Sequence, residues 1–214
     1  MFDDRKDAGI KLARALGKYK DENVIVLGIP RGGVEIAYYI ALHLNAAFSM
    51  IMTRKLGYPE SPEAAFGAIA EDGSVYLSEE AEGSVTDDEI RQAVATERAE
   101  IERRIVMLRN GNPLPDVTGR TVIIADDGIA TGATVLTAVA MCRKRNPSKV
   151  VVAAPIATQW MMTQLRKVAD EVVILEKPEY FYAVGQAYKH FENLTDEETQ
   201  RFVEIWNNRL KNAS

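Results

Sequence analysis

Two adjacent carboxylates, Asp126 and Asp127, stand at the end of an apolar run in the segment TVIIADDGIATGATV. The apolar residues before them predict a buried strand, and a helical pattern begins at Val135. The turn in between, residues 128–134, is built from small residues, and its glycines let the backbone curl closely around a ligand. Exposed N–H groups at the start of the following helix attract phosphate.

The hydroxyl groups of this turn and the acids beside it suit different partners. Thr131 and Thr134 can donate hydrogen bonds to phosphate oxygens. Asp126 and Asp127 would repel phosphate, so we expect them to bind sugar hydroxyls and a hard divalent cation. A Walker loop is excluded because the turn has no lysine, and a dinucleotide fingerprint because it lacks three glycines at the required spacing. The pattern predicts a site for a phosphorylated sugar, with an ordinary strand–turn–helix connection as the alternative.

The strand, the paired acids and the loop GIATGAT resemble the phosphoribosyl-diphosphate (PRPP) signature of the type I phosphoribosyltransferases. The resemblance implies an α/β fold, with a mainly parallel twisted sheet, helices on both faces and a small hood. It also implies PRPP and a small-molecule acceptor as substrates, with Mg2+ as cofactor. Asp126 and Asp127 would bind the ribose and the metal. The 5-phosphate would be bound by Gly128, Ile129, Ala130, Thr131, Gly132, Ala133 and Thr134.

A second candidate site follows the predicted strand NVIVLGIP, in the turn that contains Pro30, Arg31, Gly32 and Gly33. Such a string is usually an exposed Gly/Pro turn. In the family that the chain resembles, the corresponding loop cradles the pyrophosphate of PRPP, often through a cis peptide bond. The resemblance therefore implies that these four residues bind pyrophosphate, with Arg31 pairing with its oxygens.

A basic pair, Arg54 and Lys55, ends the predicted strand 46–55. A pair in this position is usually a solvated edge, but in the family a basic residue here reaches toward PRPP. Both residues are therefore expected to bind pyrophosphate, with Lys55 as the stronger candidate. The glycine- and proline-rich residues 56–74 predict a loop, with a strand over 65–70 as a further option. This loop matches the mobile flap of the family, which would exclude water from the activated ribosyl group.

Aromatic residues follow the last predicted strand, in the segment KPEYFY. Terminal core packing is the default for such residues. In the family this region forms a hood over the acceptor, so Tyr180, Phe181 and Tyr182 are candidate acceptor-binding residues. The wider resemblance, through GIPRGGVEIAYYIA and RKLGYPESPEAAFGAIAEDG, is to a subgroup of phosphoribosyltransferases with no assigned acceptor. Hood signatures of the hypoxanthine-guanine, adenine, uracil and orotate enzymes are missing from this sequence.

The resemblance implies transfer of a 5-phosphoribosyl group from PRPP to a nitrogen acceptor, a nucleobase or related amine, with release of pyrophosphate. Such a reaction belongs to nucleotide and nucleoside metabolism. Asp127, Lys55 and Arg31 are the expected catalytic residues: the two cations stabilise the leaving pyrophosphate, and Asp127 assists deprotonation of the acceptor. Two alternatives stay open, a regulatory protein of the same fold that senses PRPP or a nucleotide, and phosphorolysis or hydrolysis of a ribosyl phosphate. His43 and His190 form no metal-site or triad pattern and are expected to be structural.

Composition is typical of a soluble enzyme from a reducing compartment. The formal charge of −5 gives no field that favours nucleic acid or anionic membranes. Cys142 is the single cysteine, so an internal disulfide is excluded, and its apolar neighbours predict burial. The charged N-terminal segment is unlike a secretory signal, and no apolar run reaches the ~20 residues needed to span a bilayer. We expect a cytoplasmic protein, with a homodimer as an open possibility.

Strands alternate with helices along the chain, which predicts a mainly parallel sheet with helices on both faces. Ligands bind at the carboxyl ends of such strands, and every candidate above directly follows a predicted strand. The 214 residues fit one domain, with a core over about 20–177, a helical elaboration over about 84–111 and a hood and tail over about 178–214. The predicted strands are 23–30, 46–55, 121–126, 149–157 and 171–177, and the predicted helices are 4–19, 33–44, 86–109, 134–145, 158–168 and 195–211.

The predicted helix 86–109 is longer and more charged than a minimal sheet of this kind requires. Thr86 and Glu89 form a capping pattern at its start. Its apolar residues, at positions 90, 94, 101, 105 and 108, form one stripe that can cover only one surface. We predict that this stripe packs on its own domain beside the pocket, with any homodimer contact secondary.

Overall fold

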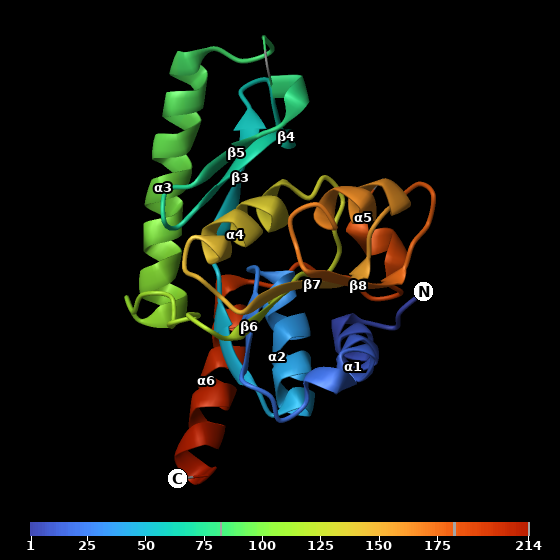
Figure 1. The fold of residues 1–214 in the computed structure, drawn as a ribbon. Coiled ribbons are helices and arrows are strands. Elements are labelled where there is room, and N and C mark those ends of the chain that lie inside the picture. The colour runs from blue at the N-terminus through green and yellow to red at the C-terminus, as the bar shows by residue number, and fades with distance from the viewer. Residues whose placement is uncertain (82, 182, 214) are drawn as a thin grey trace.

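The computed structural model describes residues 1–81, 83–181 and 183–213. Over these residues the strands form a central sheet, in the order β2-β1-β6-β7-β8, and a small sheet, β3-β4-β5 (Figure 1). No helix in this described part is long and apolar enough to cross a membrane. The strands are β1 (Val24–Gly28), β2 (Ala47–Met50), β3 (Thr53–Tyr58), β4 (Ser61–Ala70), β5 (Val75–Leu77), β6 (Thr121–Ala125), β7 (Lys149–Ile156) and β8 (Glu171–Glu176). The helices are α1 (Arg5–Ala15), α2 (Gly32–Leu44), α3 (Asp87–Arg109), α4 (Ala133–Arg143), α5 (Gln159–Leu165) and α6 (Asp196–Ala213), with 3-10 turns at Gly17–Tyr19, Glu79–Ala81 and Val184–Ala187.

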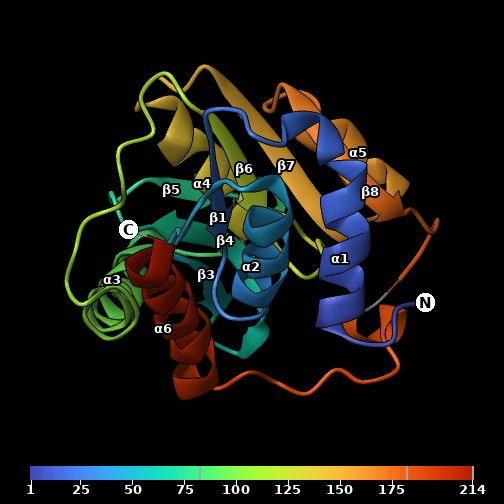
Figure 2. The ribbon, with the colours of Figure 1, turned by 90° about the horizontal axis from the view of Figure 1, so that it is seen from below.

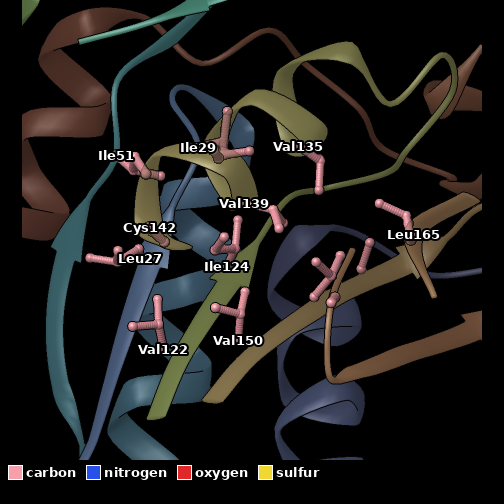
Figure 3. Close-up of a cluster of buried hydrophobic side chains, with 14 of the residues drawn as sticks. Leu27, Ile29, Ile51, Val122, Ile124, Val135, Val139, Cys142, Val150 and Leu165 are labelled. Carbon is pink, nitrogen blue, oxygen red and sulfur yellow. The ribbon is translucent and has the colours of Figure 1, made fainter. Parts of the chain in front are cut away.

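The central sheet is parallel, and helices cover both of its faces. Successive residues of a strand point to opposite faces. Leu27 and Ile124 pack with side chains of α4 and α5 in one apolar cluster (Figure 3), whereas Val26 and Ile123 pack with α1 and α2 in another. Figure 2 shows α1 and α2 together on one side of the sheet. The predicted parallel α/β fold is confirmed.

The predicted strand 46–55 is two strands that belong to different sheets. β2 pairs with β1 in parallel. Just after β2, the N–H of Ile51 donates to the carbonyl oxygen of Gly28 at 3.1 Å. Met52 then exchanges two hydrogen bonds with Glu71, one from its N–H to the carboxylate and one to its carbonyl oxygen, each 3.0 Å long. Because Glu71 takes over as the partner, the chain leaves the central sheet here and β3 begins the small one.

Residues 56–74, predicted as a loop with a strand over 65–70 as a further option, are mostly an antiparallel β-ribbon of β3 and β4, so the strand option is confirmed and the loop is not. The glycines and prolines of this segment usually indicate a loop, but here most of the segment folds into paired strands. Leu56 and Phe66 are fully buried against α3, so the ribbon has an apolar core of its own. A Cβ atom on Gly67 would overlap the carbonyl oxygen of Tyr76 on β5. This glycine therefore permits close strand packing.

The long helix α3 runs along the small sheet (Figure 1). Its predicted capping box is present: the N–H of Glu89 donates to Thr86 Oγ1 at 3.3 Å, and the N–H of Thr86 donates to Glu89 Oε2 at 2.7 Å. Ile101 and Leu108 are buried in a cluster with side chains of β3 and β4. The prediction that the apolar stripe packs on its own domain is confirmed.

Segments from both ends of the chain pack on the α1 and α2 side of the central sheet. Trp206 of α6 contacts the rings of Tyr38 and Phe48, which ties the last helix to α2 and β2. The N–H of Phe2 donates to the carbonyl oxygen of Ala187 at 2.7 Å. The N-terminal residues and the segment before α6 are therefore held together.

Cys142 lies on α4 within the cluster of Figure 3. It is fully buried, as predicted. Burial raises the pKa of its thiol to about 12, so the sulfur is neutral and unreactive near neutral pH.

A buried ion pair joins the end of α3 to the point where the chain leaves the central sheet. Arg109 Nη2 donates to Glu71 Oε2, and Nη1 of the same side chain donates to the carbonyl oxygen of Met50 at 3.2 Å. The two side chains are only 5% and 6% exposed. Because Glu71 also pairs with Met52, it connects α3 to both sheets.

We predict that Glu71→Gln destabilises the fold by about 3–5 kcal/mol, because it leaves the buried charge of Arg109 without its partner. Urea unfolding followed by circular dichroism measures the loss. The control is Lys11→Gln, which removes an exposed pair with Asp7 and should cost less than about 1 kcal/mol. A loss for Glu71→Gln no larger than that of the control would contradict this role of the buried pair.

Candidate active site

A cleft of about 940 Å³ opens where β1 and β6 end. The turn before α4, the turn before α2, strand β3, helix α3 and the segment before α6 form its walls. It brings together most of the residues predicted from the sequence, namely Pro30, Arg31, Gly32, Arg54, Lys55, Asp126, Asp127, Gly128, Ile129, Ala130, Thr131, Gly132 and Thr134. Two predicted residues, Gly33 and Ala133, are buried behind this surface. A Cβ atom on Gly33 would lie 2.6 Å from the carbonyl oxygen of Ala125, so this glycine lets α2 start close against β6.

The turn over residues 128–134 leads from β6 into the N-terminus of α4. The N–H of Ile129 donates to the carbonyl oxygen of Ile156 at 2.9 Å, which fixes the turn to β7. Gly132 adopts the left-handed conformation at φ +75° and is the N-cap of α4. A Cβ atom on Gly132 would also overlap the sulfur of Met161. Substitution of this glycine would therefore disturb packing whether or not a phosphate binds here, so it is a poor test of phosphate binding.

The two acids at the end of β6 are held differently. Asp126 Oδ1 accepts a hydrogen bond from the N–H of Asp127 at 2.9 Å. Asp127 Oδ2 forms an ion pair with Arg5 Nε at 2.8 Å. Burial, and then the neighbouring charge of Asp127, raise the pKa of Asp126 well above its ordinary value. Burial also raises the pKa of Asp127, while the charge and hydrogen bond of Arg5 act in the opposite direction.

Arg5 is a residue of this site that the sequence analysis missed. Its side chain is 7% exposed, its Nη1 donates to the carbonyl oxygen of Glu192 at 2.7 Å, and its guanidinium lies 4.0 Å from the ring centre of Phe191. A Cβ atom on Gly32 would overlap the carboxylate of Asp127 and lie 2.7 Å from Arg5 Nε. The ion pair therefore fills the space that the glycine leaves open.

One signal in the sequence points to Arg5. The residue opens α1, where the positive end of the helix dipole disfavours a cation. A cation in that place needs a compensating partner, and here the partner is an acid more than a hundred residues away. Only the folded chain identifies that partner as Asp127.

Further titratable groups surround the ion pair. Glu35 on α2 faces Arg5, and burial raises its pKa to about 7. The hydroxyl of Tyr188 donates to the carbonyl oxygen of Asp127 at 2.5 Å, and burial raises the pKa of this tyrosine. The positive charge of Arg5 thus lies among acidic groups, in direct contact with Asp127 and near Glu35.

The turn after β1 carries a cis peptide bond between Pro30 and Arg31, which matches the family feature named above. Arg31 precedes α2, and its side chain is about two-fifths exposed. Its Nη1 lies 3.8 Å from Asp196 Oδ1 at the start of α6. This distance is too long for a hydrogen bond, so Asp196 does not occupy the donors of this nitrogen.

The basic pair on β3 is divided between two environments. Arg54 Nε pairs with Glu97 Oε2 of α3 at 2.6 Å. Lys55 is exposed in the cleft and has no ion-pair partner among the described residues. Lys55 and Asp126 both line the cleft, and the charge of the lysine acts to lower the pKa of the acid. Lys55 is therefore the better placed of the two to bind a ligand anion.

Two of the three aromatic residues predicted for the acceptor side, Tyr180 and Phe181, are not among the residues that line the cleft. Tyr180 is 76% exposed, and Phe181 packs against the apolar cluster beneath α1 and α2; neither lines the cleft. Tyr182 lies outside the described residues. The chain turns inward only after these positions, and Phe191 reaches the cleft, where it contacts Arg5 and stacks on Tyr188 with ring centres 4.9 Å apart.

The two histidines do not line the cleft. His43 is exposed in the last turn of α2, and His190 is exposed beside the N-terminus, where its N–H donates to the carbonyl oxygen of Asp3 at 3.0 Å.

Residues 3–188 match a family model described as a phosphoribosyl transferase domain. A protein of Mycobacterium tuberculosis (strain CDC 1551 / Oshkosh), named "Putative phosphoribosyl transferase", is 42% identical over 206 residues, which are 95% of this chain and 46% of that protein. A protein of the H37Rv strain gives the same values. The chain thus spans about half the length of the curated relatives it matches.

Two solved structures resemble the structure of this protein. The Thermus thermophilus protein TT1426 is 36% identical, with a TM-score of 0.79 over 96% of this chain and 98% of that one. The AQ2163 protein of Aquifex aeolicus is 16% identical, with a TM-score of 0.50 over 80% of this chain and 72% of that one. The second likeness concerns the fold alone.

We predict that Asp126→Asn stabilises the ligand-free protein at pH 8. Asparagine can keep the hydrogen bond from Asp127 while it removes a buried carboxylate whose pKa is raised. For such an acid, the contribution to stability is complete below the unfolded pKa of about 3.9 and is lost as pH rises through the folded pKa, by about 1.4 kcal/mol for each unit of the shift. The advantage of the variant should therefore grow from pH 4 to pH 8.

Thermal unfolding at a series of pH values measures this difference. The control is Asp116→Asn, because Asp116 is an exposed acid whose pKa is lowered by a hydrogen bond from the N–H of Thr118. This control should show no gain at high pH. An Asp126→Asn variant that is less stable than the wild type throughout the series would refute the prediction.

Proposed function

The chain belongs to the family of phosphoribosyl transferase domains, and we propose that it uses PRPP and Mg2+ to transfer a 5-phosphoribosyl group to a nitrogen acceptor with release of pyrophosphate. One observation carries the proposal: a single cleft joins a turn at a helix N-terminus, two carboxylates and an unpaired lysine. These three parts suit the 5-phosphate, the ribose and the diphosphate of PRPP respectively.

The 5-phosphate would lie in the turn over residues 128–134. The N-terminus of the eleven-residue helix α4 provides backbone N–H groups and the positive end of its dipole. Thr131 and Thr134 line the cleft and would add hydroxyl donors. The left-handed backbone at Gly132 gives the turn the curvature that a phosphate requires.

The acids of β6 suit Mg2+, because this ion is usually bound through one or two carboxylates together with substrate phosphates. Within the described residues no group of three or more typical metal-binding side chains occurs, which suits a metal that arrives with PRPP. Asp126 is the better candidate ligand, since Asp127 Oδ2 is already paired with Arg5. When bound, Mg2+ would neutralise part of the diphosphate charge.

The remaining chemistry consists mainly of positioning and electrostatics. Asp126 and Asp127 would orient the ribose through its hydroxyls. As the bond from the anomeric carbon to pyrophosphate breaks, negative charge develops on the leaving group, and Arg31 and Lys55 would stabilise it. Asp127 would also assist deprotonation of the incoming nitrogen.

The β-ribbon would limit the access of water to the activated ribose. Gly57, Tyr58 and Pro59, at the end of β3, line the same cleft as the phosphate-binding turn. A closed site favours transfer over hydrolysis, because the ribosyl group would otherwise react with water. We propose that the ribbon takes the part that the flap has in the resembling family.

The acceptor would be a nucleobase or a related amine. Thr96 and Glu97 of α3 and Asn193 before α6 provide polar groups on the walls that the PRPP roles leave unused. These groups can hydrogen-bond the exocyclic or ring nitrogens of such a molecule.

Turnover is tested by incubating the protein with PRPP, Mg2+ and a panel of nucleobases and amines while the release of pyrophosphate is followed. Acceptor-dependent release is the expected result. Tight PRPP binding with no release for any acceptor would favour a PRPP-sensing role instead. Release that is independent of the acceptor would indicate hydrolysis.

We predict that Thr131→Val combined with Thr134→Val weakens the binding of ribose 5-phosphate about tenfold, since two hydrogen bonds of about 0.5–1.5 kcal/mol each are lost. Isothermal titration calorimetry measures the affinity. Thr163→Val, on the exposed face of α5, is the control and should leave the affinity unchanged. Equal affinities for the double variant and the wild type would show that the phosphate binds elsewhere.

A further inference from the structure

Helix α3 brings a buried arginine, Arg104, to the wall of the cleft. The side chain is 8% exposed, and its Nε donates to Glu100 Oε1 at 2.7 Å. The terminal nitrogens Nη1 and Nη2 have no hydrogen-bond partner among the described residues. A guanidinium in this state has donors available to a ligand in the cleft.

The carboxylate beside Arg104 does not fully compensate its charge. Glu100 also accepts two hydrogen bonds from Arg103, at 2.7 and 2.9 Å, and these bonds hold its pKa at about 2. Arg103 in turn pairs with Asp196 Oδ2 at 2.6 Å, and the other oxygen of Asp196 lies 3.8 Å from Arg31. Arg104 thus shares the carboxylate of Glu100 with Arg103, and Arg103 in turn shares Asp196 with Arg31.

The same network joins α3, the helix that carries Arg104, to the turn after β1. Asp196 connects α3 to that turn, because it contacts Arg103 and also lies near Arg31. Asp196 Oδ1 is itself buried without a hydrogen-bond partner in the described structure. Arg31, Lys55 and Arg104 all line the cleft, and they come from three separate elements.

A buried guanidinium whose carboxylate partner also binds a second arginine is only partly compensated, and an anion bound beside it would supply the missing charge. We propose that Arg104 is a diphosphate-binding residue, whose terminal nitrogens donate to the oxygens of the pyrophosphate group alongside Arg31 and Lys55. This inference rests on the proposed function, and it assigns part of the substrate site to α3. A planar guanidinium with two free donors is suited to phosphate oxygens.

The test is isothermal titration calorimetry with two separate probes, pyrophosphate with Mg2+ and ribose 5-phosphate. Arg104→Gln should weaken the binding of pyrophosphate by tenfold to a hundredfold and leave the affinity for ribose 5-phosphate within about twofold. Arg104→Lys keeps the charge without the forked donors, so it should lose less affinity than Arg104→Gln. Arg91→Gln changes the net charge equally from an exposed position on the same helix and should bind both probes like the wild type.

The outcomes separate this inference from the proposed function. If the wild type binds both probes and Arg104→Gln binds pyrophosphate equally well, the role of Arg104 is overturned while the proposed function stands. If the wild type binds neither probe, both fail. Thermal unfolding of each variant checks the fold, and if Arg104→Gln does not fold, an unchanged pyrophosphate affinity in Arg104→Lys overturns the inference.

Discussion

Two carboxylates at the end of a buried strand are costly to ionise, and the groups around them in the site compensate their charge. β6 lies in the middle of a sheet covered on both faces, so Asp126 and Asp127 emerge from an apolar interior with little water to solvate them. Burial raises the pKa of both. The protein answers with a cation from the far end of the sequence, Arg5, in direct contact with Asp127. Asp126 has no such direct cation partner among the described residues, which leaves it available to a ligand or a metal.

This compensation explains features that look unrelated in the sequence. Gly32 is required because the Arg5–Asp127 pair occupies the place of a side chain. Phe191 covers the guanidinium, and Tyr188 donates to the backbone of Asp127, so the segment before α6 closes over the same pair. The N-terminal residues and this segment are joined by backbone hydrogen bonds. Residues from α1 and from the segment before α6 therefore meet at the charge at the end of β6.

On the opposite wall of the cleft, arginines and carboxylates form a network in which Glu100 accepts hydrogen bonds from both Arg103 and Arg104. The small sheet and α3 share an apolar core, and above it Arg54–Glu97 and the arginines around Glu100 face the cleft or its edge. The buried pair of Arg109 and Glu71 anchors this wall to the central sheet. A rigid wall rich in guanidinium groups is well suited to a substrate with several phosphates, because the cations are held in place before the ligand arrives.

Local patterns in the sequence predict the parallel α/β fold, the capping of α3 and the strand-end residues that meet in the cleft. Apolar runs, glycine turns and capping residues are local signals, and the carboxyl ends of parallel strands necessarily converge at one edge. The sequence by itself did not determine the β-ribbon over residues 56–74, because Leu56 and Phe66 become strand residues only through their packing on α3. Nor did it reveal that Tyr180 and Phe181 are not among the residues that line the cleft, or that Arg5 and Arg104 are. Tertiary structure alone decided these, because the partner of a buried charge is chosen by proximity in space, and Asp127 lies 122 residues from Arg5 along the chain.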